Sequence, residues 1–232
     1  MSIHDGHRQR LKERYCKEGL EHFHELQVLE LLLFYCVKRG DTNPIAHALL
    51  ERFKTLSGVL EADMHELMQV PGVGEHTAIF LRLMRDMSRY YAVESVKDMK
   101  ILSTIDECGA YLAPYFMKLQ KETVFLLCLD AKCKLIVCEK IGEGSINSVN
   151  ISIRKIVERA LSCNATSVVL AHNHPSGLAL PSGEDVLTTK RLGRALYAVD
   201  VTLVDHLVFA DGDYVSLAQS GRYSIKDTQD AF

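Results

Sequence analysis

The sequence predicts a two-domain α+β protein, in which an all-α domain over residues 1–95 precedes an α/β domain over residues 101–232. Up to about Tyr91, apolar residues recur at helical spacing with few β-branched runs. From about Ile101, short apolar strands alternate with helical segments, a pattern typical of a mixed sheet flanked by helices. We therefore expect the boundary within residues 92–102.

The helical part carries recognisable helix starts. Residues 29–36 place leucines and a cysteine on one stripe, which predicts a buried helix face. Asn43 and Pro44 suggest a helix start with Asn43 as the cap and Pro44 in the first turn. Asp63 and Glu66 have capping-box spacing, which predicts a second start.

The second half reads as alternating strands and helices. A turn at residues 130–133 separates two strands that we expect to be adjacent. The predicted strands are 123–130, 134–139, 167–171 and 201–210, and the predicted helices are 153–161 and 184–198.

Composition narrows the class of protein. With 47% hydrophobic and 25% charged residues, the chain resembles an ordinary soluble protein. No apolar run approaches the roughly 20 residues that span a bilayer, and the first residues lack the apolar segment of a secretory signal. Seven cysteines without a CxxC pair favour reduced thiols. We therefore expect a cytoplasmic protein without membrane association.

Candidate metal-binding and catalytic residues are concentrated in residues 170–185, LAHNHPSGLALPSGED. His172 and His174 lie at the end of a predicted strand, where side chains two apart share a face about 7 Å apart. Asp185 lies in the first turn of the next helix and can complete a His2Asp set. Three protein ligands leave the fourth tetrahedral position for water, as in catalytic zinc sites.

Each half of this pattern has an ordinary structural explanation. A single His-x-His occurs at any spacing in exposed or core positions, and Ser182 with Asp185 is also a capping-box pattern. The combination is more specific: His-x-His at a strand end, seven residues, Ser, two residues, Asp.

That full pattern resembles the JAMM signature of the JAB/MPN metalloprotease superfamily. Its residues, HNHPSG followed by PSGED, resemble the RadC-like branch of that superfamily. Residues 131–133, 142–147, 171–185 and 204–206 fall where that family has recognisable segments. The resemblance implies that His172, His174 and Asp185 bind zinc. It also implies that Ser182 helps to stabilise an oxyanion, besides any capping role.

A hydrolase of this kind needs a general base. In JAMM enzymes a glutamate from an upstream strand takes this role, and Glu122, immediately before the strand at 123–130, matches that place best. Glu139 and Glu143 remain competitors. Glu184 is a neighbour of Asp185 that we do not expect to take part.

Two other histidine-containing segments attract attention. Asp205 and His206 lie in the next strand, where a hydrogen-bonded pair packed beside the site is favoured over a ligand role. The second His-x-His, His22 to His24, has a setting that looks helical, so its imidazoles are not expected to face each other. Neither HExxH nor the zinc deaminase motif is present.

A glycine turn marks the end of the helical part. Residues 67–91 read as a short helix, a turn containing Gly72 and Gly74, and a longer helix. This resembles a helix-hairpin-helix motif, whose backbone N–H groups can hold a DNA phosphate without reading sequence. The alternative is a turn that only packs two helices.

Charge around this turn is balanced. Residues 1–92 hold 12 Lys and Arg against 13 Asp and Glu, and the chain has a net charge of −3. Arg82, Arg85 and Arg89 can supply one basic stripe, with Arg82 closest to the turn. Glu75 and His76 follow the turn, where a phosphate site gains from Lys or Arg.

Two functions follow from these patterns. The first is a zinc-dependent hydrolase of peptide or isopeptide bonds, with a helical domain that positions it. The second is a DNA-associated protein, in line with the DNA-repair name of the RadC-like family, in which the metal is structural or acts on an unidentified substrate. The sequence names neither a substrate nor an oligomeric state.

Overall fold

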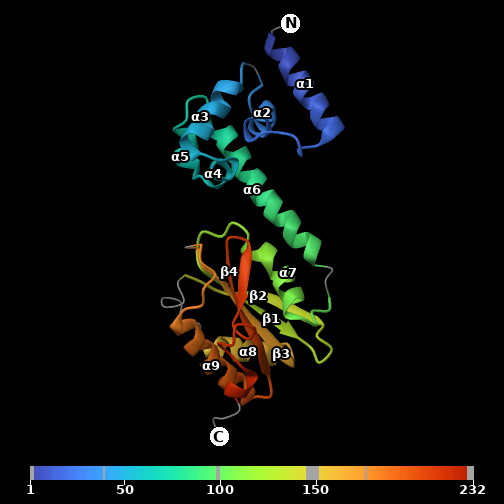
Figure 1. The fold of residues 1–232 in the computed structure, drawn as a ribbon, viewed down its shortest axis with the longest axis vertical. Helices are drawn as coiled ribbons and strands as arrows, with labels where there is room; N and C mark the ends of the chain where they lie inside the picture. Colours follow the sequence, from blue (N-terminus) through green and yellow to red (C-terminus); the bar gives the residue numbers. More distant parts are fainter. Residues whose placement is uncertain (1–2, 39, 98–99, 145–151, 176, 229–232) are drawn as a thin grey trace. The chain divides into compact units, whose positions relative to one another are not determined.

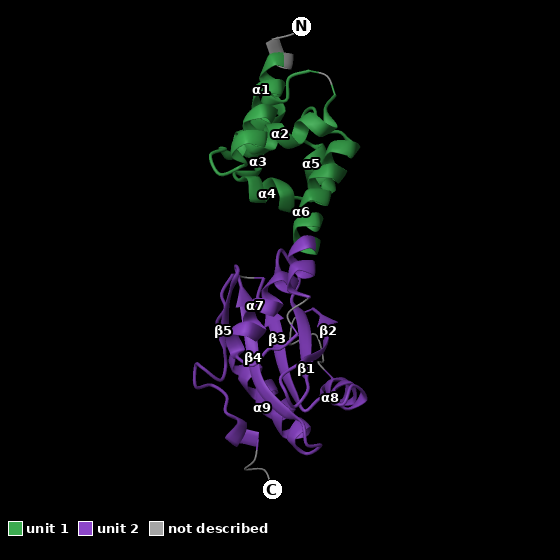
Figure 2. Cartoon of the chain, turned by 90° about the vertical axis from the view of Figure 1, so that its right-hand side faces the viewer, with its two compact units in different colours: residues 1–90 green, residues 91–232 purple. Residues whose placement is uncertain are grey.

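The chain folds into two compact units in a computed structural model that describes residues 3–38, 40–97, 100–144, 152–175 and 177–228. We call Met1–Tyr90 the helical unit and Tyr91–Phe232 the sheet unit (Figure 2). Helix α6 (Glu75–Val96) runs across this division. Residues 145–147, part of a segment used above for the family resemblance, lie outside the described residues.

The helical unit confirms the all-α prediction. Its core contains Leu29, Leu33, Leu49 and Leu81, all of which are fully buried. The helices are α1 (Ile3–Glu18), α2 (Glu25–Cys36), α3 (Asn43–Phe53), α4 (Leu56–Glu61), α5 (Met64–Met68) and the first part of α6.

Two predicted helix starts in this unit are confirmed, but the capping interactions differ from the prediction. Helix α3 begins at Asn43 with Thr42 as its N-cap, because the carboxylate of Asp41 accepts the Asn43 N–H at 3.0 Å and leaves Asn43 inside the helix. Asp63 is the N-cap of α5 as expected, but its side chain makes no capping bond. Its carboxylate instead accepts from Arg82 Nη1 at 3.4 Å.

The setting of the second His-x-His is also corrected. His22 lies in a turn after α1, and His24 is the N-cap of α2, with extended backbone angles. The His24 N–H donates to Gln27 Oε1 at 3.3 Å, so the side chain of Gln27 marks the helix start. The segment is therefore a connection between helices and not part of one.

The sheet unit confirms the predicted α/β pattern (Figure 1). All four predicted strands and both predicted helices are present, with ends shifted by a few residues. The short strand β5 and the helices α7 and η1 were not predicted. The elements are α7 (Ile105–Phe116), β1 (Thr123–Leu129), β2 (Leu135–Glu143), α8 (Ile153–Ser162), β3 (Ser167–Asn173), α9 (Gly183–Tyr197), β4 (Thr202–Ala210), β5 (Asp213–Ser216) and the 3-10 helix η1 (Ile225–Thr228).

The five strands found in the described residues form one mixed sheet in the order β2-β1-β3-β4-β5. Strands β3 and β4 are parallel, and the other neighbouring pairs are antiparallel. The parallel pair is joined through α9, as a parallel connection requires a crossover. Because β3 lies between β1 and β4, residues at its end have neighbouring strands on both sides.

Helices cover both faces of this sheet (Figure 1). On one face, Phe116 of α7 stacks on Phe209 with ring centroids 4.5 Å apart. On the other face, Ile156 of α8 and Leu192 of α9 pack around Leu170 of β3. The sheet is therefore the middle of three layers, with one apolar core on each side.

Helix α7 begins with a capping box, in which Thr104 Oγ1 accepts the Glu107 N–H at 3.2 Å and the Glu107 carboxylate accepts the Thr104 N–H at 3.0 Å. Gly109 allows β5 to approach, because a Cβ there would lie 2.5 Å from the ring of Tyr214. Pro114 lies near the last turn of the helix. Gly109 and Pro114 weaken the sequence pattern, which explains why α7 was not predicted.

Membrane-spanning helices were searched for among the described residues. None of the helices there combines the length and the apolar character needed to cross a bilayer.

Candidate metal centre

The two histidines lie where β3 ends. His172 shares a face of the sheet with Leu170, because side chains two apart point the same way, and that face is covered by α8 and α9. His174 follows the last strand residue, and its N–H donates to the carbonyl of Phe209 at 2.8 Å. This bond to β4 keeps the chain extended for one more residue, so that both imidazoles remain on one side.

Helix α9 supplies the carboxylate. Ser182 is its N-cap, and the Asp185 N–H donates to Ser182 Oγ at 3.1 Å. In return, Asp185 Oδ2 accepts from both the N–H and the hydroxyl of Ser182 at 2.7 Å. The predicted capping box is thus confirmed, and it fixes the orientation of the Asp185 carboxylate.

These three side chains meet at one point. His172 Nε2 and His174 Nε2 lie 2.9 Å apart. Asp185 Oδ1 is 3.5 Å from His172 Nε2, and Asp185 Oδ2 is 3.6 Å from His174 Nε2. His172 and Asp185 are buried, whereas the His174 side chain is 18% exposed, so the cluster opens toward solvent on the His174 side.

Glu122 lies at the same cluster. Glu122, His172 and His174 each bring one ligand atom within 4.8 Å of the others and form a group that can hold a metal ion. The antiparallel register of β1 and β3 explains this proximity. Val124 pairs with His172, so Glu122, two residues before Val124, lies opposite His174, two residues after His172. Two carboxylates, Glu122 and Asp185, thus flank the pair of imidazoles.

Asn173 points away from the histidines and holds the segment that carries Glu122. Its Oδ1 accepts the Thr123 N–H at 2.8 Å, and its Nδ2 donates to the Lys121 carbonyl at 3.2 Å. The amide therefore bonds the backbone on both sides of Glu122. Because the buried Asn173 lies between His172 and His174 in the chain, one tripeptide sets the positions of both imidazoles and of the adjacent glutamate.

The other glutamates considered for the base have different partners. Glu139 forms an ion pair with Arg159, and Glu143 pairs with Lys140 and with Lys121 at 3.2 Å. The two lysines lower the pKa of Glu143. Glu184 is exposed, on the first turn of α9 beside buried Asp185. Of the four glutamates, Glu122 is the one that lies with His172 and His174 in the group able to hold a metal ion.

Asp205 and His206 lie beside the cluster and are hydrogen-bonded to each other through the His206 N–H, but their side chains have different further partners. His206 Nε2 is 2.7 Å from His172 Nδ1 and thus contacts a candidate ligand from behind. Asp205 accepts from the N–H groups of His206 and Ala218 and from the Ser216 hydroxyl. Asp205 therefore joins β4 to the turn after β5.

Burial sets the protonation of these histidines. Burial, and then the neighbouring His174, lower the pKa of His172 to about 3. Burial also lowers the pKa of His206 well below its usual range. Both imidazoles are therefore neutral near pH 7, and each presents one N–H and one lone pair.

Thr189 is a member of this neighbourhood that the sequence analysis did not identify. Its hydroxyl lies 2.6 Å from His206 Nδ1 and 2.6 Å from the Asp185 carbonyl. Thr189 follows Asp185 by one helical turn, so both side chains face the sheet. A polar residue at that spacing on the buried stripe of α9 was the available sequence signal.

The glycine turn of the helical unit is present between α5 and α6. Gly72 has a φ of +88°, and a Cβ there would lie 2.9 Å from the Ile45 side chain. The Gly74 carbonyl accepts from the Ala78 N–H at 3.0 Å, which starts α6. Gly72 and Gly74 are exposed, while Val73 between them is buried in the core.

The arginines near this turn already have partners. Arg82 pairs with Asp63 at 3.4 Å, and Arg85 pairs with Asp86 at 2.9 Å. Glu75 occupies the first turn of α6. Contact of Gly72, Gly74 and Arg82 with DNA stays a prediction.

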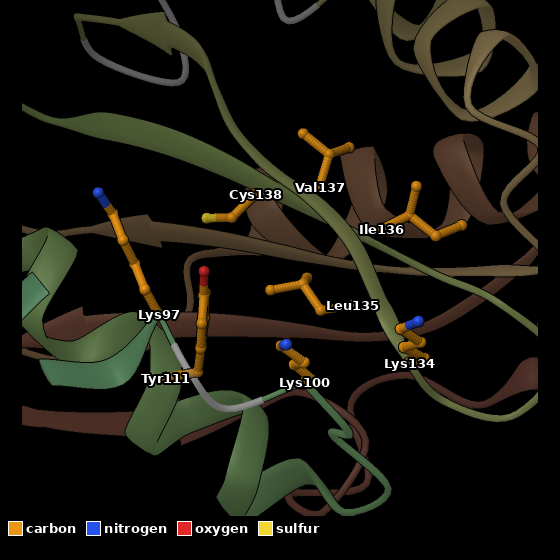
Figure 3. A pocket seen from close by; sticks show the side chains of 8 residues that line it. All are labelled: Lys97, Lys100, Tyr111, Lys134, Leu135, Ile136, Val137 and Cys138. Carbon is orange, nitrogen blue, oxygen red and sulfur yellow. The ribbon is translucent and has the colours of Figure 1, made fainter. Parts of the chain in front are cut away.

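A separate cavity of about 340 Å³ opens at the beginning of edge strand β2 (Figure 3). It is lined by Lys97, Lys100, Tyr111, Lys134 and residues 135–138. None of the predicted metal ligands, base candidates or capping residues lies among them. The cavity is therefore distinct from the metal centre.

Comparison with known proteins agrees with this geometry. A family model described as the RadC-like JAB domain matches residues 102–222, which is more than half of the chain. UPF0758 protein FN0909 from Fusobacterium nucleatum is 30% identical over 223 residues, covering 93% of this chain and 96% of that protein. A similarity that extends over the helical unit and the sheet unit together places the chain in the RadC-like JAB domain family.

Proposed function

We propose that this protein is a zinc-dependent hydrolase of the JAMM type that cleaves peptide or isopeptide bonds. The observation that carries the proposal is the convergence of two imidazole nitrogens and one carboxylate within 2.9–3.6 Å of one another, with Glu122 beside them. Membership in a family related to metallohydrolases supports the same interpretation.

The donor set fits zinc. In a tetrahedral site with zinc–nitrogen and zinc–oxygen distances near 2.05 Å, neighbouring ligand atoms lie about 3.3 Å apart. The three separations here, 2.9, 3.5 and 3.6 Å, lie around that value. Two histidines and one carboxylate are also the ligand types that zinc prefers, and three of them leave one position for water.

When bound, zinc would lower the pKa of a water molecule toward neutrality and polarise a carbonyl group. His172 and His174 would hold it through Nε2, and Asp185 through the carboxylate that Ser182 orients. The open side at His174 gives a substrate access to this point.

Glu122 is the proposed general base. It lies within reach of the imidazole nitrogens but comes from the residue before β1, whereas Asp185 comes from α9. A carboxylate in this place can accept a proton from water and pass it to a leaving amine. The amide of Asn173 limits its movement by holding the backbone on both sides.

Ser182 is the proposed oxyanion donor. Its hydroxyl donates to Asp185 Oδ2 at 2.7 Å, so this donor must turn from the carboxylate before it can serve a substrate oxygen. The N-terminal end of α9, with its partial positive charge, favours developing negative charge at the same place.

Metal content tests the first half of the proposal. We expect about one zinc per chain in the protein purified without added metal, measured by elemental analysis, and loss of that zinc in His174→Ala. Glu184→Gln, which changes an exposed neighbour of Asp185, serves as the matched control and should retain zinc. A wild-type protein that is empty and takes up no added zinc would overturn the proposal.

Cleavage tests the second half. The zinc-loaded protein is incubated with a mixture of peptides prepared from a cell extract, and new peptide termini are measured by mass spectrometry. We expect new termini with the wild type and a loss of about 10²- to 10⁴-fold with Glu122→Gln, which should keep its zinc. Equal cleavage by both proteins would remove Glu122 from the mechanism.

A further inference from the structure

A line of buried hydrogen bonds leads from the backbone of α9 to the imidazole of His172. Thr189 Oγ1 lies 2.6 Å from the Asp185 carbonyl oxygen and 2.6 Å from His206 Nδ1. His206 Nε2 lies 2.7 Å from His172 Nδ1. Thr189, His206 and His172 are all at most 1% exposed, so water does not compete for these bonds.

The carbonyl at one end fixes the direction of every bond in this line. A carbonyl oxygen only accepts, so the Thr189 hydroxyl donates to the Asp185 carbonyl. The Thr189 oxygen is then the acceptor for His206, whose Nδ1 must carry the hydrogen.

The same direction continues into the metal centre. A second proton on His206 would place a positive charge on a fully buried ring, so its Nε2 keeps a lone pair. That lone pair accepts from His172, whose hydrogen therefore lies on Nδ1. The Nε2 lone pair of His172 then faces the point shared with His174 and Asp185.

We propose that Thr189 and His206 are positioning residues that hold His172 in the Nδ1–H form and so direct its Nε2 lone pair to the metal. The helix that supplies the Asp185 carboxylate through its side chain thereby also sets the tautomer of His172 through its backbone. This inference rests on the proposed metal-binding role of His172.

The Nδ1 atom of His174 has a different partner. It lies 3.0 Å from the Leu178 carbonyl, which only accepts, so Nδ1 carries a hydrogen. The Leu178 carbonyl belongs to the loop before α9, whereas Thr189 lies within α9 and His206 within β4. His174 is therefore an internal reference for any change made at Thr189.

The matched variants are Thr189→Val and Thr189→Ser. Valine has nearly the shape of threonine but neither donates nor accepts, so His206 loses the partner that fixes its Nδ1–H. Serine keeps the hydroxyl. Because partners behind a metal-binding histidine typically change metal affinity by about 10- to 100-fold, we expect Thr189→Val to weaken zinc binding by about that factor and Thr189→Ser to stay within about threefold of the wild type.

The deciding measurement is ¹⁵N NMR of the histidine rings in the full-length, metal-free protein. In the wild type we expect the Nδ1–H form for His172 and His206 and a hydrogen on Nδ1 of His174. In Thr189→Val we expect mixed forms of His172 and His206, with Nδ1 of His174 unchanged. Zinc affinity is measured in parallel by competition with a chromophoric chelator.

The outcomes separate this inference from the proposed function. A wild-type His172 in the Nε2–H form would overturn the inference even if zinc binds. A folded Thr189→Val protein with wild-type affinity and wild-type tautomers would also overturn it. The expected tautomers in a protein that takes up no zinc would support the hydrogen-bond direction while contradicting the hydrolase.

Discussion

The sheet unit and the helical unit each contain a candidate functional motif beside a turn. The two motifs differ in whether their polar side chains already have a partner of opposite charge. At the end of β3, the Nε2 atoms of His172 and His174 lie 2.9 Å apart and 3.5–3.6 Å from the carboxylate of Asp185, so that nitrogen and oxygen atoms able to bind a metal face one another. Beside the glycine turn, the Arg82 guanidinium already has the Asp63 carboxylate as its partner.

This difference shows which part of a motif carries functional information. Buried polar atoms that converge on one point are costly unless partners satisfy them, so the convergence of two imidazoles and a carboxylate favours a bound cation. A surface ion pair is worth only about 0–1 kcal/mol, and it argues neither for nor against a partner. The residue pattern alone does not distinguish the two cases.

The largest expected effect is the loss of zinc binding when the negative charge of Asp185 is removed. Asp185→Asn should abolish zinc binding at stoichiometric concentration, because it removes the one negative ligand and replaces an oxygen acceptor of the Ser182 N–H and hydroxyl by an amide. Isothermal titration with zinc measures this, with Glu184→Gln as the control. An Asp185→Asn protein that binds zinc normally would transfer the carboxylate ligand role to Glu122, the other carboxylate at the histidines.

The two cores should respond separately to large-to-small substitutions. Leu170→Ala in the sheet and Leu81→Ala in α6 each remove a fully buried side chain and should cost about 2–5 kcal/mol in their own unit. We expect Leu81→Ala to leave zinc binding unchanged and Leu170→Ala to weaken it, since Leu170 precedes His172 on the same face. Thermal melting followed with and without zinc tests this, and equal loss of zinc binding in both variants would contradict the separation.

A smaller effect is expected at the cap of α9. Ser182→Ala removes the acceptor of the Asp185 N–H and a donor to Asp185 Oδ2, which should cost about 1 kcal/mol in stability and about tenfold in zinc affinity. Ser182→Thr, which keeps the hydroxyl, is the control. Unchanged stability and affinity together with lost cleavage would leave Ser182 with the oxyanion role alone.

The fold could be predicted where local pattern and tertiary role agree. Strand β3 is buried from Val168 to Asn173 and was recognised from its apolar run, and α9 from its capping box. Helix α7 was not predicted because Gly109 and Pro114 interrupt its pattern, and both are tolerated through packing that the sequence does not display. Strand β5 has four residues, too few for an alternating pattern to stand out.

The candidate site, too, could be predicted only where local sequence spacing determines the positions of its residues. The spacing from His172 to Asp185 lies within one strand, one loop and one helix turn, so local reasoning was sufficient to bring the three side chains together. The position of Glu122 depends on the pairing of β1 with β3, some 50 residues apart, and only the register places it opposite His174. The link from Thr189 through His206 to His172 also crosses two elements, and no spacing rule predicts it.

The smallest expected effect concerns DNA, and it returns to the ion pair beside the glycine turn. Arg82→Ala should weaken binding of the full chain to duplex DNA by less than about threefold, because the guanidinium must first leave Asp63. Asp63→Asn frees the same guanidinium and should strengthen binding by a similar factor. Fluorescence anisotropy over a range of salt concentrations measures both, since a protein that neutralises one phosphate fewer has a salt dependence smaller by about one charge. If neither variant nor the wild type binds at low salt, Gly72 and Gly74 serve packing or a protein partner, and the contrast between the two units becomes one between a ligand site and a structural turn.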